Sequence, residues 1–195
     1  MSVFRCERIA AGADLKREKK STRRIPQNVP YVVDNLWEWA RPEGYPSRRF
    51  AVCGSPTPEA SGKSAIHADK LYRIDPPENA LVVQLKGIED AKFHPDCKSL
   101  KRTLTSSLTK MGWTEKPLEE KRKIAPLWAP GLTKEEVESL FSLEPLRGIR
   151  EEMWNAVTFW KDLRRLDSVG DLEDKVGEIF FEADEWILQP VDEGE

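Results

Sequence analysis

Arg49–Glu59, with the sequence RFAVCGSPTPE, is the stretch around which we expect the chain to be organised. Its apolar run is stopped by a glycine and two prolines, which predicts a short buried strand that ends abruptly. Ser55 and Thr57 follow this strand, just where a helix is expected to begin. A hydroxyl at such a point either caps the helix or orients a ligand. Both roles remain open for Ser55.

Length and composition place limits on the rest of the chain. Its 195 residues suffice for one core, so we predict a single domain over 1–195, with a mainly helical insertion at about 95–168. A net charge of −3 disfavours a dedicated nucleic-acid coat but allows a local basic patch. Three dispersed cysteines and two histidines predict a reducing compartment and no metal site. No apolar run reaches the roughly 20 residues that span a bilayer, so we expect a cytoplasmic protein without a membrane partner.

Patterns typical of strands and of helices both occur, which predicts an α+β fold. We expect strands at 3–6, 50–53, 70–74 and 80–85, and a C-terminal hairpin formed by 175–182 and 186–188. We expect helices at 31–40, 58–68, 99–111 and 145–166, and a TxxE capping box at 133–136. Trp37 and Trp39 point about 200° apart on the first of these helices, so one should be core and the other half exposed or beside a cleft.

Three charged features could carry function. Arg5 lies in the first predicted strand and is either a surface residue or a cation that needs an anionic partner. Six cations occur between Lys16 and Arg24, which predicts either a solvated loop or a surface for phosphate groups. Glu178 begins the last apolar run, where a carboxylate is either a solvated strand end or a base above a cleft.

Arginine on the first strand, Ser-x-Thr after a middle strand and glutamate before a late strand occur here in that order. The segments are VFRCE at 3–7, FAVCGSPTP at 50–58 and GEIFF at 177–181. In order and spacing they resemble the Arg-Ser-Glu branch of the ADP-ribosyltransferase superfamily. The resemblance implies a single domain with a split, bent, mixed β-sheet, flanking helices and a central cleft that binds NAD.

The resemblance also implies a role for each matching residue. Arg5 would hold the phosphate or ribose side of NAD, and the backbone at Cys6 would face the nicotinamide amide. Ser55 would orient that arginine and the nicotinamide ribose, while Thr57 would support the turn. Glu178 would hydrogen-bond the ribose and stabilise the oxocarbenium-like centre that forms when nicotinamide leaves.

Together these residues predict an enzyme that transfers ADP-ribose from NAD to a macromolecule, without a metal. Val176 stands two positions before Glu178, where arginine-modifying members carry a second glutamate or glutamine, so RNA or DNA is favoured as the acceptor. The resemblance implies a toxin-like or host-modifying protein, with a neutralising antitoxin as a further partner. The alternative is a non-catalytic nucleic-acid- or protein-binding module that uses the basic segment at 16–24 and the cationic helix at 98–110.

Overall fold

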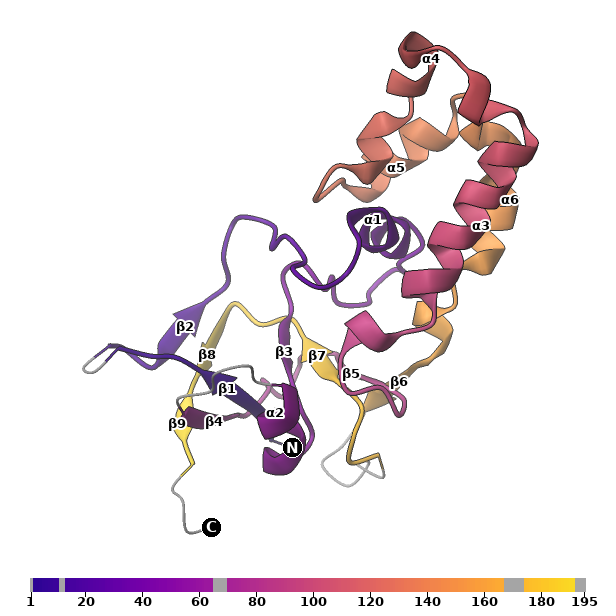
Figure 1. Ribbon diagram of the computed structural model, residues 1–195. Helices are drawn as coiled ribbons and strands as arrows, with labels where there is room; N and C mark the ends of the chain where they lie inside the picture. Colours follow the sequence, from indigo (N-terminus) through magenta and orange to yellow (C-terminus); the bar gives the residue numbers. More distant parts are fainter. Residues whose placement is uncertain (1, 11–12, 65–69, 167–173, 192–195) are drawn as a thin grey trace. The chain divides into compact units, whose positions relative to one another are not determined.

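The computed structural model describes residues 2–10, 13–64, 70–166 and 174–191, apart from the side chains of 62–64. The fold is mixed α+β, as predicted (Figure 1). The chain divides into two compact units, which are described separately. The β unit comprises Met1–Arg23, Gly44–Ala91 and Asp162–Glu195, and the helical unit comprises Arg24–Glu43 and Lys92–Lys161. None of the helices described is long and apolar enough to cross a membrane.

The β unit contains antiparallel strands and one helix. The strands are β1 Val3–Glu7, β2 Lys16–Glu18, β3 Val52–Gly54, β4 Lys70–Ile74, β5 Val82–Leu85, β6 Leu163–Leu166, β7 Ile179–Phe181, β8 Glu185–Ile187 and β9 Gln189–Pro190, and the helix is α2 Pro58–Ser64. Their orders are β1-β4-β9, β2-β8 and β3-β7-β5-β6. Every pairing between the described strands is antiparallel, so the predicted mixed sheet has no parallel pair in this part of the chain.

A cluster of buried apolar side chains from several strands forms a core in the β unit. Val3 pairs with Ile74 across β1 and β4, and both are fully buried. Ile179 and Phe181 of β7 belong to the same cluster and are also fully buried. Alternate residues of a strand point to opposite faces, and Phe180 between them is also fully buried, so β7 is covered on both faces.

The predicted C-terminal hairpin is wrong. β7 pairs with β3 and β5, whereas β8 pairs with β2, and β7 and β8 do not pair with each other. Two consecutive strand-like runs form a hairpin only when they are each other's best partners. Here β7 is apolar and buried at all three positions, and it lies between β3 and β5 in the sheet.

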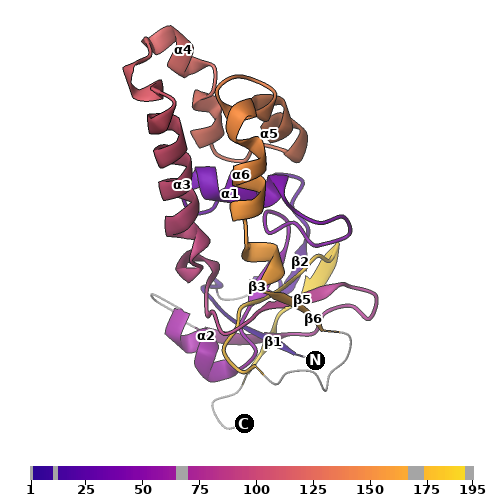
Figure 2. The ribbon, with the colours of Figure 1, turned by 90° about the vertical axis from the view of Figure 1, so that its right-hand side faces the viewer.

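The helical unit contains α1, from the earlier chain segment, and α3, which is followed by seven further α or 3₁₀ segments. The bounds are α1 Tyr31–Trp39, α3 Asp96–Lys110, α4 Leu118–Arg122, α5 Lys134–Phe141, α6 Arg150–Ala156 and the 3₁₀ turns η2 Trp113–Glu115, η3 Ala125–Trp128, η4 Leu146–Ile149 and η5 Phe159–Lys161, while η1 Ala91–Phe93 spans the boundary between the units. α3 and α6 lie side by side (Figure 2). The capping box predicted at 133–136 is confirmed at the start of α5.

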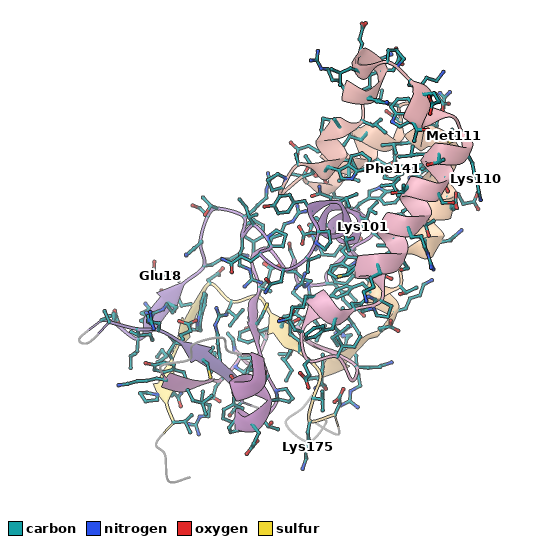
Figure 3. All side chains as sticks on the ribbon, viewed as in Figure 1. Glu18, Lys101, Lys110, Met111, Phe141 and Lys175 are labelled. Atoms are coloured by element: carbon teal, nitrogen blue, oxygen red, sulfur yellow. The ribbon has the colours of Figure 1, made fainter. Side chains whose placement is uncertain are left out.

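α1 is buried on both sides, which corrects the expectation for Trp39. Trp37 stacks on Phe159 with ring centroids 4.1 Å apart, and Trp39 stacks on Phe141 (Figure 3) with centroids 4.3 Å apart. Both tryptophans are at most 1% exposed. A helix that has neighbours on opposite sides buries both faces, and periodicity alone does not reveal the second neighbour.

The predicted long helix over 145–166 is also wrong. The segment contains η4, α6 and η5 and ends in strand β6. The apolar stripe is still buried, but the helix ends at Ala156 because the N–H groups of Thr158 and Phe159 both donate to Asp96, each at 3.0 Å. Those donors would otherwise bond within the helix, so a buried carboxylate from α3 ends it.

The protonation of Glu138 makes the stability of the helical unit depend on pH. The indole N–H of Trp39 donates to the Glu138 carboxylate at 2.7 Å. This hydrogen bond, together with Arg150, lowers the pKa of Glu138 below its usual value, although partial burial acts in the opposite direction. A depressed folded-state pKa stabilises the fold above the unfolded value of about 4.3, and this stabilisation is lost as the pH falls through the folded pKa.

We therefore expect Glu138→Gln to be less stable than the wild type at pH 7, with the difference shrinking as the pH falls below about 4. Urea unfolding at pH 7 and at lower pH measures that difference. Glu119→Gln, an exposed carboxylate on α4, is the matched control. If the difference in the free energy of unfolding between Glu138→Gln and the wild type stays constant over this pH range, the lowered pKa of Glu138 is contradicted.

Candidate functional site

Three strands of the β unit bring the motif-bearing segments together. The Phe4 N–H donates to the Ser55 carbonyl at 2.8 Å, and the Ser55 N–H donates to the Phe4 carbonyl at 2.7 Å. On its other side β3 pairs with β7, with Gly54 opposite Ile179. Segments near residues 5, 55 and 178 are therefore neighbours in one unit, although they lie far apart in the sequence.

Gly54 makes this close approach feasible. A Cβ atom at this position would lie 2.4 Å from a Val3 methyl group and 2.6 Å from the Phe4 carbonyl oxygen. Both distances are below any ordinary non-bonded contact, so a side chain here would push β1 away from β3. The glycine that was expected to end the strand also sets the spacing between the first and second motif segments.

Arg5 has its anionic partner within its own strand. Its Nε lies 2.6 Å from a Glu7 carboxylate oxygen, and its Nη1 donates to the Cys53 carbonyl at 3.2 Å. The Arg5 side chain is about one-third exposed (33%), so solvent reaches the guanidinium. Cys6 lies opposite Leu71 of β4, and its sulfur accepts a hydrogen bond from the Ser61 hydroxyl at 3.4 Å.

Thr57, and not Ser55, caps the helix after the turn. The Ala60 N–H donates to the Thr57 hydroxyl at 3.2 Å, and the Ser61 N–H donates to the Thr57 carbonyl at 3.1 Å. Ser55 is 5% exposed, and its backbone pairs with β1. The capping alternative for Ser55 is therefore wrong, because the helix begins two residues later than that alternative requires.

Glu178 precedes β7, and its side chain has a defined partner. One carboxylate oxygen accepts the Ala91 N–H at 2.9 Å. Both of its backbone groups are hydrogen-bonded, since the Glu178 N–H donates to the Ile88 carbonyl and the Glu178 carbonyl accepts from the Leu85 N–H, each at 2.8 Å. The side chain is partly buried.

Asp174 was missed by the sequence analysis, although it organises the bend before Glu178. Its carboxylate accepts the N–H groups of Gly87 at 2.5 Å, Val176 at 2.9 Å and Gly177 at 3.2 Å. Burial acts to raise the pKa of Asp174, but these three donors outweigh it and lower that pKa below its usual value. In an Asx turn an aspartate side chain accepts the N–H two residues on, here that of Val176, and an aspartate just before a glycine-containing turn is the sequence signal for it.

Two of the six cations of the basic segment, Lys16 and Lys19, pair with acidic residues of the β unit. β2 pairs with β8, which places Lys16 2.8 Å from Glu185. Lys19 lies 2.5 Å from Glu182. The Arg17 guanidinium donates to the Asp14 carbonyl. At 16–18 the segment is therefore a short strand and not a loop, while a surface for phosphate groups stays a prediction.

A cavity of about 780 Å³ lies elsewhere in the β unit. Its lining includes Tyr45, Leu81, Glu182 and Asp184, and it includes none of the three residues that the motifs single out. Among the described residues no group of three or more histidine, cysteine or acidic side chains could hold a metal ion. The cavity and the motif residues are therefore separate features of this unit.

The site thus consists of three adjacent strand segments with one cation, one buried serine and one carboxylate, each held by named contacts. The chain matches no family model, no curated protein and no solved structure.

Proposed function

We propose that the β unit is an NAD-dependent ADP-ribosyltransferase that releases nicotinamide and modifies a macromolecule, with nucleic acid favoured over protein arginine. The observation that carries the proposal is the adjacency of β1, β3 and β7. It supports the proposal because a dinucleotide needs its phosphate-binding and ribose-binding groups on one continuous surface. We further propose a toxin-like role in the cytoplasm, with an antitoxin as a neutralising partner.

In this proposal each residue has a chemical role. Arg5 pairs with an NAD phosphate, because a guanidinium binds phosphate through parallel hydrogen bonds. Glu178 accepts a hydrogen bond from the nicotinamide ribose and stabilises positive charge at its C1′ atom. The C1′–nitrogen bond breaks with its electron pair passing to nicotinamide, which leaves neutral, and an acceptor nucleophile then bonds to C1′ and gives up its proton.

Glu7 competes with NAD for Arg5 in this scheme. Glu7→Gln removes the carboxylate 2.6 Å from the guanidinium and frees it for phosphate. Because the pair is partly exposed, its contribution is about 1 kcal/mol or less, so we expect the KM for NAD to fall by up to about fivefold with kcat little changed. Steady-state kinetics of nicotinamide release measures both constants. A higher KM in Glu7→Gln would contradict this role of Arg5.

The proposed function is tested by incubating the full chain with NAD and quantifying free nicotinamide. Reactions with RNA, DNA or protein, using NAD labelled in its adenylate portion, identify the acceptor by transfer of the label. Transfer to nucleic acid with equimolar nicotinamide release is the expected result. No release with any acceptor would contradict the enzyme assignment.

The alternative is a binding module that uses the basic segment. The ion pairs of Lys16 and Lys19 with Glu185 and Glu182 make this alternative weaker, since they reduce the charge available to phosphates. It predicts salt-sensitive binding of nucleic acid or protein, no nicotinamide release, and no effect of Glu178→Gln on that binding.

A further inference from the structure

The bend that leads into β7 is fastened to β5 by a set of contacts that neither the motifs nor the proposed chemistry uses. Gln84 is in β5 and is only 1% exposed. Its side-chain N–H₂ group donates to the carbonyl oxygens of Asp174, at 2.7 Å, and Gly177, at 3.2 Å. A buried glutamine in a strand core has a desolvation cost, so these two bonds need to be formed for the side chain to be tolerated.

The orientation of this amide follows from its neighbours. Both partners of the Gln84 nitrogen are carbonyl oxygens, so reversing the amide would face an oxygen toward two oxygens. The Gln84 side-chain N–H₂ group therefore donates two hydrogen bonds to the bend at residues 174–177.

Gly177 and Asp174 complete the attachment from the other side. A Cβ atom at Gly177 would lie 1.8 Å from the Leu85 carbonyl oxygen, so only glycine lets the bend approach β5 this closely. The Asp174 carboxylate bonds to Gly87 beyond the end of β5 and to the N–H groups of Val176 and Gly177 within the bend. We call Asp174, Gln84 and Gly177 the β5 clamp.

The next residue after the clamp is Glu178. Its N–H donates to the Ile88 carbonyl, its carbonyl accepts from the Leu85 N–H, and its carboxylate reaches the Ala91 N–H. The clamp therefore fixes the backbone immediately before Glu178, whose backbone bonds to Leu85 and Ile88 and whose carboxylate bonds to Ala91. A shift of the bend would move this carboxylate relative to β1 and β3.

We propose that the β5 clamp positions Glu178 for ADP-ribosyl transfer, so that Asp174, Gln84 and Gly177 are positioning residues of the site. This inference rests on the proposed function. A carboxylate that stabilises a developing charge must be held in place before the reaction, and a displacement of about 1 Å can lower a rate by about 100-fold. The clamp residues act on kcat through Glu178 and do not contact NAD.

Gln84→Met is the most informative variant, because methionine has a similar volume and removes both hydrogen bonds, together with an amide oxygen that is buried without a hydrogen-bond partner among the described residues. We expect a melting temperature close to that of the wild type, a kcat for nicotinamide release lower by about 10- to 100-fold, and a KM for NAD within about twofold. Asp174→Ala should lower kcat similarly, and Asp174→Asn should recover part of the loss, because the asparagine oxygen can still accept from the bend.

Lys175→Ala is the matched control. Lys175 lies between the clamp residues, is exposed and points away from the unit (Figure 3), so its loss should leave both kinetic constants unchanged. Hydrogen exchange provides a measurement that does not depend on activity. The amide of Glu178 should exchange at least about tenfold faster in Gln84→Met than in the wild type or Lys175→Ala, because its hydrogen-bonded segment opens more often.

The outcomes separate this inference from the function itself. Unchanged kcat in an active Gln84→Met, or unchanged exchange at Glu178, overturns the clamp. A Gln84→Met variant that loses both kcat and a large part of its melting temperature, with no recovery of kcat in Asp174→Asn, also overturns the clamp. That pattern indicates a purely structural role. A wild type that releases no nicotinamide overturns the proposed function and the kinetic role of the clamp together, while the exchange rates still decide whether the clamp holds Glu178.

Discussion

Replacing Asp96 by alanine should destabilise the helical unit by about 3–5 kcal/mol, the largest effect on stability that we expect. Asp96 is 1% exposed. Its carboxylate accepts the Trp37 indole N–H at 2.9 Å, the N–H groups of Thr158 and Phe159, and the Thr158 hydroxyl at 2.8 Å. Alanine would remove the acceptor of two buried N–H groups, those of the Trp37 indole and Phe159, and of the partly buried Thr158 N–H, and each buried donor left unpaired costs about 1–3 kcal/mol.

Asp96→Asn should be milder, with a cost of about 1–2 kcal/mol. The asparagine oxygen can take the place of the carboxylate oxygen that accepts all three N–H groups. The Thr158 hydroxyl, which now donates to the other oxygen, can rotate and accept from the asparagine N–H₂ group instead. The predicted order of stability is wild type, then asparagine, then alanine.

Urea unfolding followed by tryptophan fluorescence measures this order. Six of the seven tryptophans belong to the segments of the helical unit, and only Trp186 belongs to the β unit, so fluorescence reports mainly on the helical unit. Glu119→Gln removes one exposed negative charge from the same unit and should change stability by less than about 0.5 kcal/mol. Equal stability of the alanine variant and the wild type would contradict the role assigned to Asp96.

Glu178→Gln should lower nicotinamide release by about 100- to 1,000-fold, the largest effect on activity that we expect. The substitution removes the negative charge opposite the developing oxocarbenium-like centre. It keeps an amide oxygen that can accept the Ala91 N–H, the contact the carboxylate makes at 2.9 Å. We therefore expect a melting temperature close to that of the wild type, which separates chemistry from folding.

Glu178→Ala provides the second half of this experiment. It leaves the Ala91 N–H without its acceptor, so it should lose activity to the same extent and about 1 kcal/mol of stability as well. Glu185→Gln, an exposed carboxylate of β8 that pairs with Lys16, is the control for a change in charge and should keep full activity. Wild-type rates in both Glu178 variants would show that the carboxylate has no part in the reaction.

Local patterns predicted several elements well. The first strand and the helix of Trp37 lie where alternation or 3.6-residue periodicity placed them, and the helix predicted at 99–111 is observed at Asp96–Lys110. The capping box at Thr133 is also local, because both of its hydrogen bonds join residues three apart. Each of these features depends on neighbours within one turn or one strand.

The errors have non-local causes. The helix predicted through residue 166 ends at Ala156 because Asp96, about 60 residues earlier, takes the N–H groups of Thr158 and Phe159. The C-terminal hairpin is absent because β7 lies between β3 and β5. In the candidate site, the residue types were identified from the sequence, but the clamp before Glu178 and the pairing of Arg5 with Glu7 were not.

The amino-acid sequence alone determined where strands and helices begin in much of this chain, because periodicity, prolines and capping residues act over a few positions. Only the tertiary structure decided which strands are neighbours and which buried groups share hydrogen bonds. Strand neighbours and shared hydrogen bonds depend on which residues, distant in sequence, pair with the same partner in the folded chain. The adjacency of β1, β3 and β7, on which the proposed function depends, is of this second kind.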